Sequence, residues 1–237
     1  MKTTSTLSIV AALVACSQAA TAGDITGKVT LKGTPPPEKT IDMKADPGCG
    51  KMHTETVKTR FYVVGSAGEL ADTVVMLKGI SGKSTGASAA PLVIDQKGCE
   101  YQPYVAVAQT GQKIVVKNSD PVLHNVSTIR DKAAEGNKQS NLAQMPGGAD
   151  LNFTFPAAEN FLRFKCDVHP WMFSYITVVD HPYVAVTGED GSFSIKGVPP
   201  GKYTIVALHR KAAPNGVEQE IEVTADGAKS DFTLEAK

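Results

Sequence analysis

The sequence has no excess of charge of either sign and no long apolar run beyond its N-terminus. Lys and Arg total 24, and Asp and Glu also total 24, so the formal net charge is zero. A nucleic-acid-binding protein usually carries a basic excess or a basic stripe, and neither is present. After the N-terminal segment, no apolar run approaches the roughly 20 residues that a transmembrane helix needs. The composition therefore excludes nucleic acid as an expected partner, and no membrane-spanning domain is expected.

The sequence also lacks any sustained apolar repeat of 3.6 residues, so helix should be minor. Instead, 21 Gly and 14 Pro are scattered between short apolar runs. The length of 237 residues allows one large domain or two small ones with ample core. We predict an all-β protein built from sandwiches of short strands. The predicted strands include Ile25–Leu31, Phe61–Val64, Thr73–Leu77, Tyr104–Ala108, Lys113–Lys117, Phe161–Lys165 and Tyr175–Val179, whereas residues 130–148 are expected to form a loop.

The N-terminus indicates an export signal. Lys2 precedes an apolar stretch, Leu7–Ala15, that is too short to span a membrane. Cleavage after Ala20-Thr21-Ala22 would remove a signal peptide of residues 1–22. Alternatively, Leu13-Val14-Ala15-Cys16 looks like a bacterial lipobox, and removal of residues 1–15 would leave Cys16 lipidated. Both readings predict a periplasmic protein, soluble or lipid-anchored, whose only membrane contact would be through Cys16.

Cysteines are few, and the compartment decides how they are interpreted. Cys16 belongs to the signal or the lipid anchor, and Cys166 lies in a metal-ligating motif described next. Cys49 and Cys99 remain. Two thiols in an oxidising compartment most simply pair, so we predict a Cys49–Cys99 disulfide.

The most informative stretch is the run from Cys166 to Met172. It places a thiol, an imidazole (His169) and a thioether within a few residues, and the loop Asp120–Val126 can add a second imidazole, His124. Two His, one Cys and one Met form the ligand set of a blue-copper centre, a trigonal His₂Cys site with a weak axial Met. Zinc is the main competitor, but structural zinc sites use four Cys or His ligands and Met is not among them.

The positions of these residues on predicted strands also fit a metal site. Cys166 ends one strand and Met172 lies near the start of the next, so a tight loop returns both to one end of a sandwich. His124 comes from a separate loop, so the metal would connect the two sheets. We expect His169 to lie nearest the surface, where it would serve as the port for electrons.

Both loops resemble those of known copper proteins. Cys166–Met172, with the pattern Cys-x2-His-Pro-x-Met, looks like the short ligand loop of amicyanin, and Asp120–Val126 looks like the first-histidine loop of plastocyanin and amicyanin. The resemblance covers residues 91–180 and implies a Greek-key cupredoxin sandwich. It assigns three equatorial copper ligands and one axial ligand, which are His124, Cys166, His169 and Met172.

The resemblance further implies hydrogen bonds to the Cys166 sulfur. It places the backbone N–H of Asn125 near that atom. Amicyanin carries Pro two residues after its ligand Cys, whereas this chain has Val168. We therefore expect the Val168 N–H to make a second hydrogen bond to the thiolate.

The C-terminal residues 181–237 form a different module. Asp190–Ile195 followed by Gly197–Tyr203 is similar to carboxypeptidase-regulatory-like (transthyretin-like) domains, which implies a small second β-sandwich without catalysis. This piece offers only four or five strands. We therefore expect strands from residues 23–90 to complete it, with the cupredoxin domain inserted between its two halves.

Together these features predict a type 1 copper protein that carries single electrons between larger redox proteins of the periplasm or envelope. An enzyme is not expected, because Met172 would fill the position that inner-sphere chemistry needs. The alternative is a copper-binding protein for homeostasis or delivery that does not turn over electrons.

Overall fold

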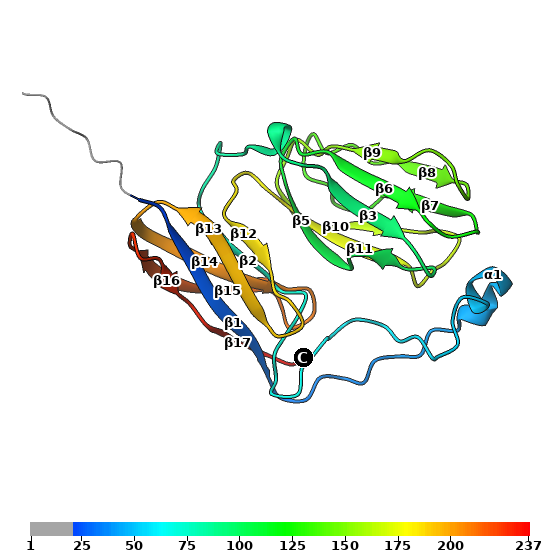
Figure 1. Ribbon diagram of the computed structural model, residues 1–237, viewed down its shortest axis with the longest axis horizontal. Coiled ribbons are helices and arrows are strands. Elements are labelled where there is room, and N and C mark those ends of the chain that lie inside the picture. The colour runs from blue at the N-terminus through cyan, green and yellow to red at the C-terminus, as the bar shows by residue number, and fades with distance from the viewer. Residues whose placement is uncertain (1–20) are drawn as a thin grey trace, which may run out of the picture.

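The computed structural model describes residues 21–237 and shows an all-β chain (Figure 1). The predicted export signal, apart from its last two residues, lies outside the described residues, as does Cys16. In the described part, helix is limited to α1 (Pro47–Gly50) and two 3-10 turns, η1 (Met43–Ala45) and η2 (Gly86–Ser88). No helix within residues 21–237 is long and apolar enough to cross a membrane. The predicted fold class and the small helical content are therefore confirmed.

One pair of sheets is built from the middle of the chain, and we call it the central sandwich. Its strands are β3 (Leu92–Gln96), β4 (Tyr101–Gln102), β5 (Val105–Gln109), β6 (Ile114–Asn118), β7 (His124–Ser127), β8 (Asn141–Gln144), β9 (Leu151–Phe153), β10 (Glu159–Lys165) and β11 (Phe173–Val179). The sheet orders are β5-β11-β10-β7-β8 and β4-β3-β6-β9. β5 pairs in parallel with β11, and β3 with β6, so the chain crosses repeatedly between the two sheets.

A second pair of sheets, the flanking sandwich, combines both ends of the described chain. Its strands are β1 (Gly23–Lys32), β2 (Val74–Lys78), β12 (Val184–Val186), β13 (Ser192–Val198), β14 (Gly201–His209), β15 (Ala213–Val223), β16 (Ala228–Lys229) and β17 (Phe232–Glu235). One sheet has the order β13-β1-β16, with β17 also on β1, and the other has the order β12-β2-β14-β15. The N-terminal strands thus complete the C-terminal module, and the central sandwich is inserted between them.

Period-2 alternation explains the strands that sequence alone located. In β1, Ile25, Val29 and Leu31 are buried while their neighbours face outward. Two elements differ from the expectation. Residues 61–64 form no strand and contribute only an isolated bridge from Val64 to Leu70. Within the expected loop, β8 forms and pairs with β7; of its residues only Gln144 is buried, so no apolar alternation marked it.

A long irregular connection, residues 33–73, links β1 to β2. Figure 1 shows it leaving the flanking sandwich and reaching the far end of the central sandwich, where α1 lies. There the disulfide between Cys49 and Cys99 joins it to the turn after β3, as predicted. Both cysteines are fully buried in the core of the central sandwich. The connection therefore brings N-terminal residues to the end of the sandwich that carries the ligand loops.

Candidate metal centre

Three of the predicted ligands meet in the structure. His124 begins β7, Cys166 follows β10, and His169 lies in the loop before β11. Their donor atoms all lie within 4.8 Å of one another. The two Nδ1 atoms are 3.0 Å apart, and the Cys166 sulfur is 3.7 Å from Nδ1 of His169. All three side chains are at most 1% exposed, so the donors converge in a dry pocket.

The fourth predicted ligand, Met172, closes the same loop. Its carbonyl accepts the N–H of Cys166 at 3.2 Å, and its own N–H donates to the carbonyl of His169 at 3.0 Å. These bonds hold the start and the end of the loop together. The Met172 side chain is 1% exposed and packs in the same core cluster as Cys166.

Each histidine of the cluster has a carboxylate at its outer nitrogen. His124 Nε2 lies 2.9 Å from Asp120, and His169 Nε2 lies 3.2 Å from Asp46. Because a carboxylate accepts hydrogen bonds, both rings carry their proton on Nε2, which leaves Nδ1 as the atom with a free lone pair. Two such lone pairs cannot face each other at 3.0 Å unless a proton or a metal cation lies between them.

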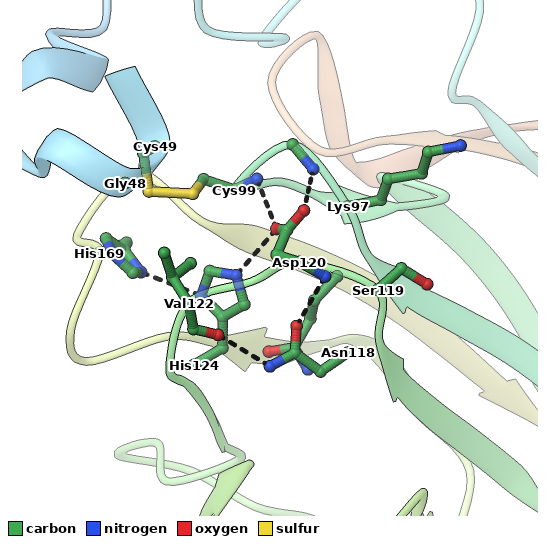
Figure 2. Close-up of polar contacts among 12 residues, drawn as sticks. Gly48, Cys49, Lys97, Cys99, Asn118, Ser119, Asp120, Val122, His124 and His169 are labelled. Carbon is green, nitrogen blue, oxygen red and sulfur yellow. Dashed lines mark hydrogen bonds and ion pairs between the residues drawn. A yellow bond between two sulfur atoms is a disulfide. The ribbon is translucent and has the colours of Figure 1, made fainter. Parts of the chain in front are cut away.

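Asp120 is itself held in place. Besides His124, it accepts the backbone N–H groups of Gly98 at 2.6 Å and Cys99 at 2.8 Å (Figure 2). Burial works to raise the pKa of Asp120, but the hydrogen bonds from His124, Cys99 and Gly98 outweigh it and lower the pKa. The carboxylate therefore stays ionised beside the ring. Sequence reasoning placed Asp120 in the His124 loop without giving it a role; its position four residues before the histidine was the available signal.

The pKa of Cys166 is lowered and the pKa of His124 is raised, and both shifts favour the charged form of the side chain. Burial works to raise the pKa of Cys166, but hydrogen bonds from His124 and from the backbone N–H groups of Asn125 and His169 lower it to about 7. Burial works to lower the pKa of His124, but Asp120 and Cys166 raise it to about 8. The Asn125 N–H is the one that the resemblance implied. We expected the second N–H to be that of Val168. It is that of His169 instead, and Val168 is 48% exposed.

Asn125 connects the two ligand loops. Its side-chain oxygen accepts the N–H of Asp167 at 2.6 Å and lies 3.3 Å from the Cys166 sulfur. Its carbonyl accepts the buried hydroxyl of Tyr101 at 2.6 Å. These contacts hold β7 against the Cys166 loop.

The expectation that His169 is the exposed ligand is wrong. The ring is 1% exposed, and Asp46, the N-cap of α1, lies at its outer nitrogen. The disulfide sulfurs lie within 4.8 Å of a His169 ring nitrogen, and Trp171 packs 5.2 Å away, centroid to centroid. Asp46 was missed at the sequence level, because it is far from His169 in the chain and lies in an irregular segment without a pattern.

Comparison with known proteins gives distant structural likenesses. No protein-family model and no curated protein matches the sequence. An oxidised amicyanin variant is similar over 44% of this chain and 97% of its own, at 18% identity and a TM-score of 0.33. The purple cupredoxin from Nitrosopumilus maritimus is similar over 38% of this chain and 99% of its own, at 20% identity and a TM-score of 0.30.

A copper-containing nitrite reductase from Thermus scotoductus is similar over 38% of this chain, at 18% identity and a TM-score of 0.33. The matched region spans only 22% of that reductase.

Proposed function

We propose that the central sandwich binds one copper ion at a type 1 site and transfers single electrons. Nδ1 of His124, Sγ of Cys166 and Nδ1 of His169 would hold the ion, and the thioether of Met172, which lies in the same core cluster, would be the fourth donor. Copper bound there exchanges one electron, and soft sulfur together with imidazole suits both of its oxidation states. The observation that carries the proposal is the pair of Nδ1 lone pairs, 3.0 Å apart and next to a thiol whose pKa is lowered.

Burial supports electron transfer in preference to catalysis. Each of the three donor side chains is at most 1% exposed, so a substrate has no direct path to the ion. The hydrogen bonds of Asp120 and Asn125 hold the donors in place before the ion arrives. A prearranged, enclosed site changes little between oxidation states, which favours outer-sphere transfer.

The covered His169 favours a second candidate, copper storage or delivery without electron turnover. An electron-transfer site usually needs a ligand edge near the surface, and here both histidine rings are covered. Reversible one-electron reduction of the loaded protein, without release of copper, supports electron transfer. Loss of the ion on reduction supports the delivery role.

We place the protein beyond the cytoplasmic membrane, where its partners are larger redox proteins. The Cys49–Cys99 disulfide fits an oxidising compartment, in agreement with the predicted signal. A lipid anchor at Cys16 remains the alternative to a soluble mature chain. The flanking sandwich, which unites β1 and β2 with residues 181–237, fits a carboxypeptidase-regulatory-like module without catalytic residues.

Addition of Cu(II) to the purified protein tests this function. We expect an intense absorption in the red part of the visible spectrum and narrow copper hyperfine splitting, because the Cys166 thiolate donates strongly to Cu(II). The variant Cys166→Ser should keep the fold, since the two side chains are similar in size, but should lose the intense band. A pale, ordinary Cu(II) spectrum of the unaltered protein would contradict the proposal.

A further inference from the structure

A short segment of the long connection covers the His169 ring. Residues 43–50, which comprise η1 and α1 and which we call the cap, contribute two residues that lie close to this ring, Asp46 and Cys49. Asp46 of the cap lies 3.2 Å from Nε2 of His169. The ring is 1% exposed. The Nε2 edge of the imidazole is therefore bonded to the cap and closed to solvent.

We propose that the cap, locked by the Cys49–Cys99 disulfide, uses Asp46 to position His169 and to seal the metal centre from solvent and from direct contact with a partner. Asp46 is a positioning residue, because it acts on the donor atom through the imidazole ring. The inference deepens the proposed copper function and rests on it for its purpose. The positioning of His169 itself can be measured without copper.

The Asp46 carboxylate is oriented by the cap's own backbone. Its Oδ1 atom accepts the N–H groups of Gly48 at 2.7 Å and Cys49 at 3.1 Å, as an N-cap does at the start of α1. This leaves Oδ2 directed at His169. Asn is an equally good N-cap, but in Asp46→Asn the amide group that replaces Oδ2 is a donor and cannot accept the Nε2–H.

The disulfide fixes the cap beside His169. Cys99 donates its N–H to Asp120, the partner of His124, and accepts the indole N–H of Trp171 at 3.1 Å. Figure 2 shows the disulfide beside the His169 and His124 rings. Both sulfur atoms belong to fully buried residues, so an attacking thiolate has no access. The disulfide is thus a permanent lock.

The cap also seats closely on the loop that carries the first histidine. A Cβ atom at Gly48 would lie 2.3 Å from Cγ1 of Val122. Val122 is β-branched and has little rotamer freedom with which to move away. A side chain at position 48 therefore lifts the cap, whereas removal of the Val122 methyl groups makes room for it.

The test measures access to His169 in the metal-free full chain. Diethyl pyrocarbonate modifies accessible imidazole nitrogens, and mass spectrometry gives the rate at His169. In Asp46→Asn we expect this rate to rise by about tenfold, the factor that corresponds to the loss of one net hydrogen bond from the closed state. The control is Asp42→Asn, because Asp42 directly precedes the cap as the N-cap of η1 and accepts the N–H of Lys44 instead of bonding to His169.

A rescue experiment separates the position of the cap from general damage to the fold. Gly48→Ala should raise the rate at His169 by a similar factor, and the double variant Gly48→Ala/Val122→Ala should return it toward that of the unaltered protein. A His169 rate that stays the same in both Asp46→Asn and Gly48→Ala overturns the cap proposal. A rate that rises equally in Asp42→Asn also overturns the proposal, because the effect would then not depend on the contact between Asp46 and His169.

Copper spectra keep this proposal distinct from the proposed function. With Cu(II) bound, Asp46→Asn should change the hyperfine splitting and let azide perturb the spectrum, while Asp42→Asn should do neither. An unaltered spectrum in Asp46→Asn overturns the positioning role. A protected His169 in a protein that gives only a pale Cu(II) spectrum overturns the copper function and leaves the cap supported.

Discussion

At the scale of single residues, the decisive feature is the pairing of each histidine with a carboxylate. Asp120 and Asp46 hold the protons on the two Nε2 atoms, so the two Nδ1 atoms have to point inward as acceptors. Carboxylates behind metal-ligating imidazoles fix the tautomer and raise ligand basicity. In the metal-free protein a proton takes the place of the ion, which is consistent with the raised pKa of His124.

Replacement of Asp120 should therefore weaken metal binding without removing a ligand. For Asp120→Asn we expect Cu(II) affinity to fall by about 10- to 100-fold, the usual cost of losing such a partner. Competition with a chelator of known affinity measures it. Asp150→Asn is the matched control, because Asp150 is exposed and lies outside the cluster. An affinity equal to that of the control would show that Asp120 does not support His124.

A second residue-scale prediction concerns pH and the flanking sandwich. His209 is 2% exposed, and burial, helped by the charge of Arg210, lowers its pKa to about 4. Below the ordinary histidine pKa of about 6.5, His209 binds a proton in the unfolded chain but stays neutral in the folded protein. Stability is therefore lost as the pH falls from about 6.5 toward about 4, at about 1.4 kcal/mol per pH unit.

The variant His209→Asn tests this sign. In the unaltered protein, Nδ1 of His209 accepts the N–H of Ala212 at 3.0 Å. The side-chain oxygen of Asn can accept the same N–H, but Asn does not titrate. Urea unfolding of the metal-free protein at about pH 7.5 and about pH 5 should show that the variant loses about 2 kcal/mol less than the unaltered protein over this range. His53→Asn is the control for loss of an imidazole elsewhere. Equal losses in all three proteins would contradict the assignment.

At the scale of elements, β1 is the strand on which the flanking sandwich depends. It pairs antiparallel with β13 and parallel with β16 and β17. At Gly27 a Cβ atom would lie 1.8 Å from the carbonyl oxygen of Ser230 and 2.8 Å from the Phe193 ring. The close approach of neighbouring backbone thus requires glycine at this position.

Gly27→Ala should consequently destabilise the protein by about 1–3 kcal/mol, the usual cost of overpacking a filled core. Gly201→Ala is the matched control, because a Cβ there meets its nearest atoms, on the Tyr203 ring, at an ordinary 3.4 Å. Chemical denaturation of both variants gives the comparison. If the two variants are equally stable, β1 is not packed as closely as described.

The elements also show which strands a sequence can reveal. β10 alternates between buried and less buried residues from Phe161 to Lys165, and its period-2 pattern predicted it. β8 is mostly exposed and edge-paired to β7, so burial left no apolar signature in it. Residues 61–64 carry an apolar run, yet they pack as irregular chain against the flanking sandwich. Their apolar character predicted a strand, but only Tyr62 is buried and Val64 is exposed.

At the scale of the whole molecule, the two sandwiches are interleaved in sequence. β2 lies between β12 and β14, and β12 has no other strand partner among the described residues. Residues on β1 and β2, such as Ile25, Val29 and Leu77, form part of the flanking core. Taken alone, residues 181–237 therefore lack β2, the strand between β12 and β14, and the core side chains of β1 and β2.

The isolated fragment 181–237 should accordingly be unfolded. Circular dichroism and proton NMR are expected to show a random chain with little dispersion. The control joins residues 23–82 to residues 181–237 through a short glycine-serine linker, with Cys49→Ser to avoid a free thiol, and it should fold. A dispersed spectrum from the isolated fragment would show that the N-terminal strands are not needed.

The sequence by itself determined the all-β class, the disulfide and the three donor residues that meet, because each depends on local alternation or on residue chemistry. His124, Cys166 and His169 converge as expected, but β7 and β10 belong to one sheet, so these donors do not connect the two sheets as predicted. Only the tertiary structure decided that Asp46 and Asp120 set the tautomers and that the cap covers His169. The physical reason is distance along the chain. Residues 33–73 have no periodic pattern, and their placement depends on a disulfide to the central sandwich and on packing between segments that are far apart in the chain.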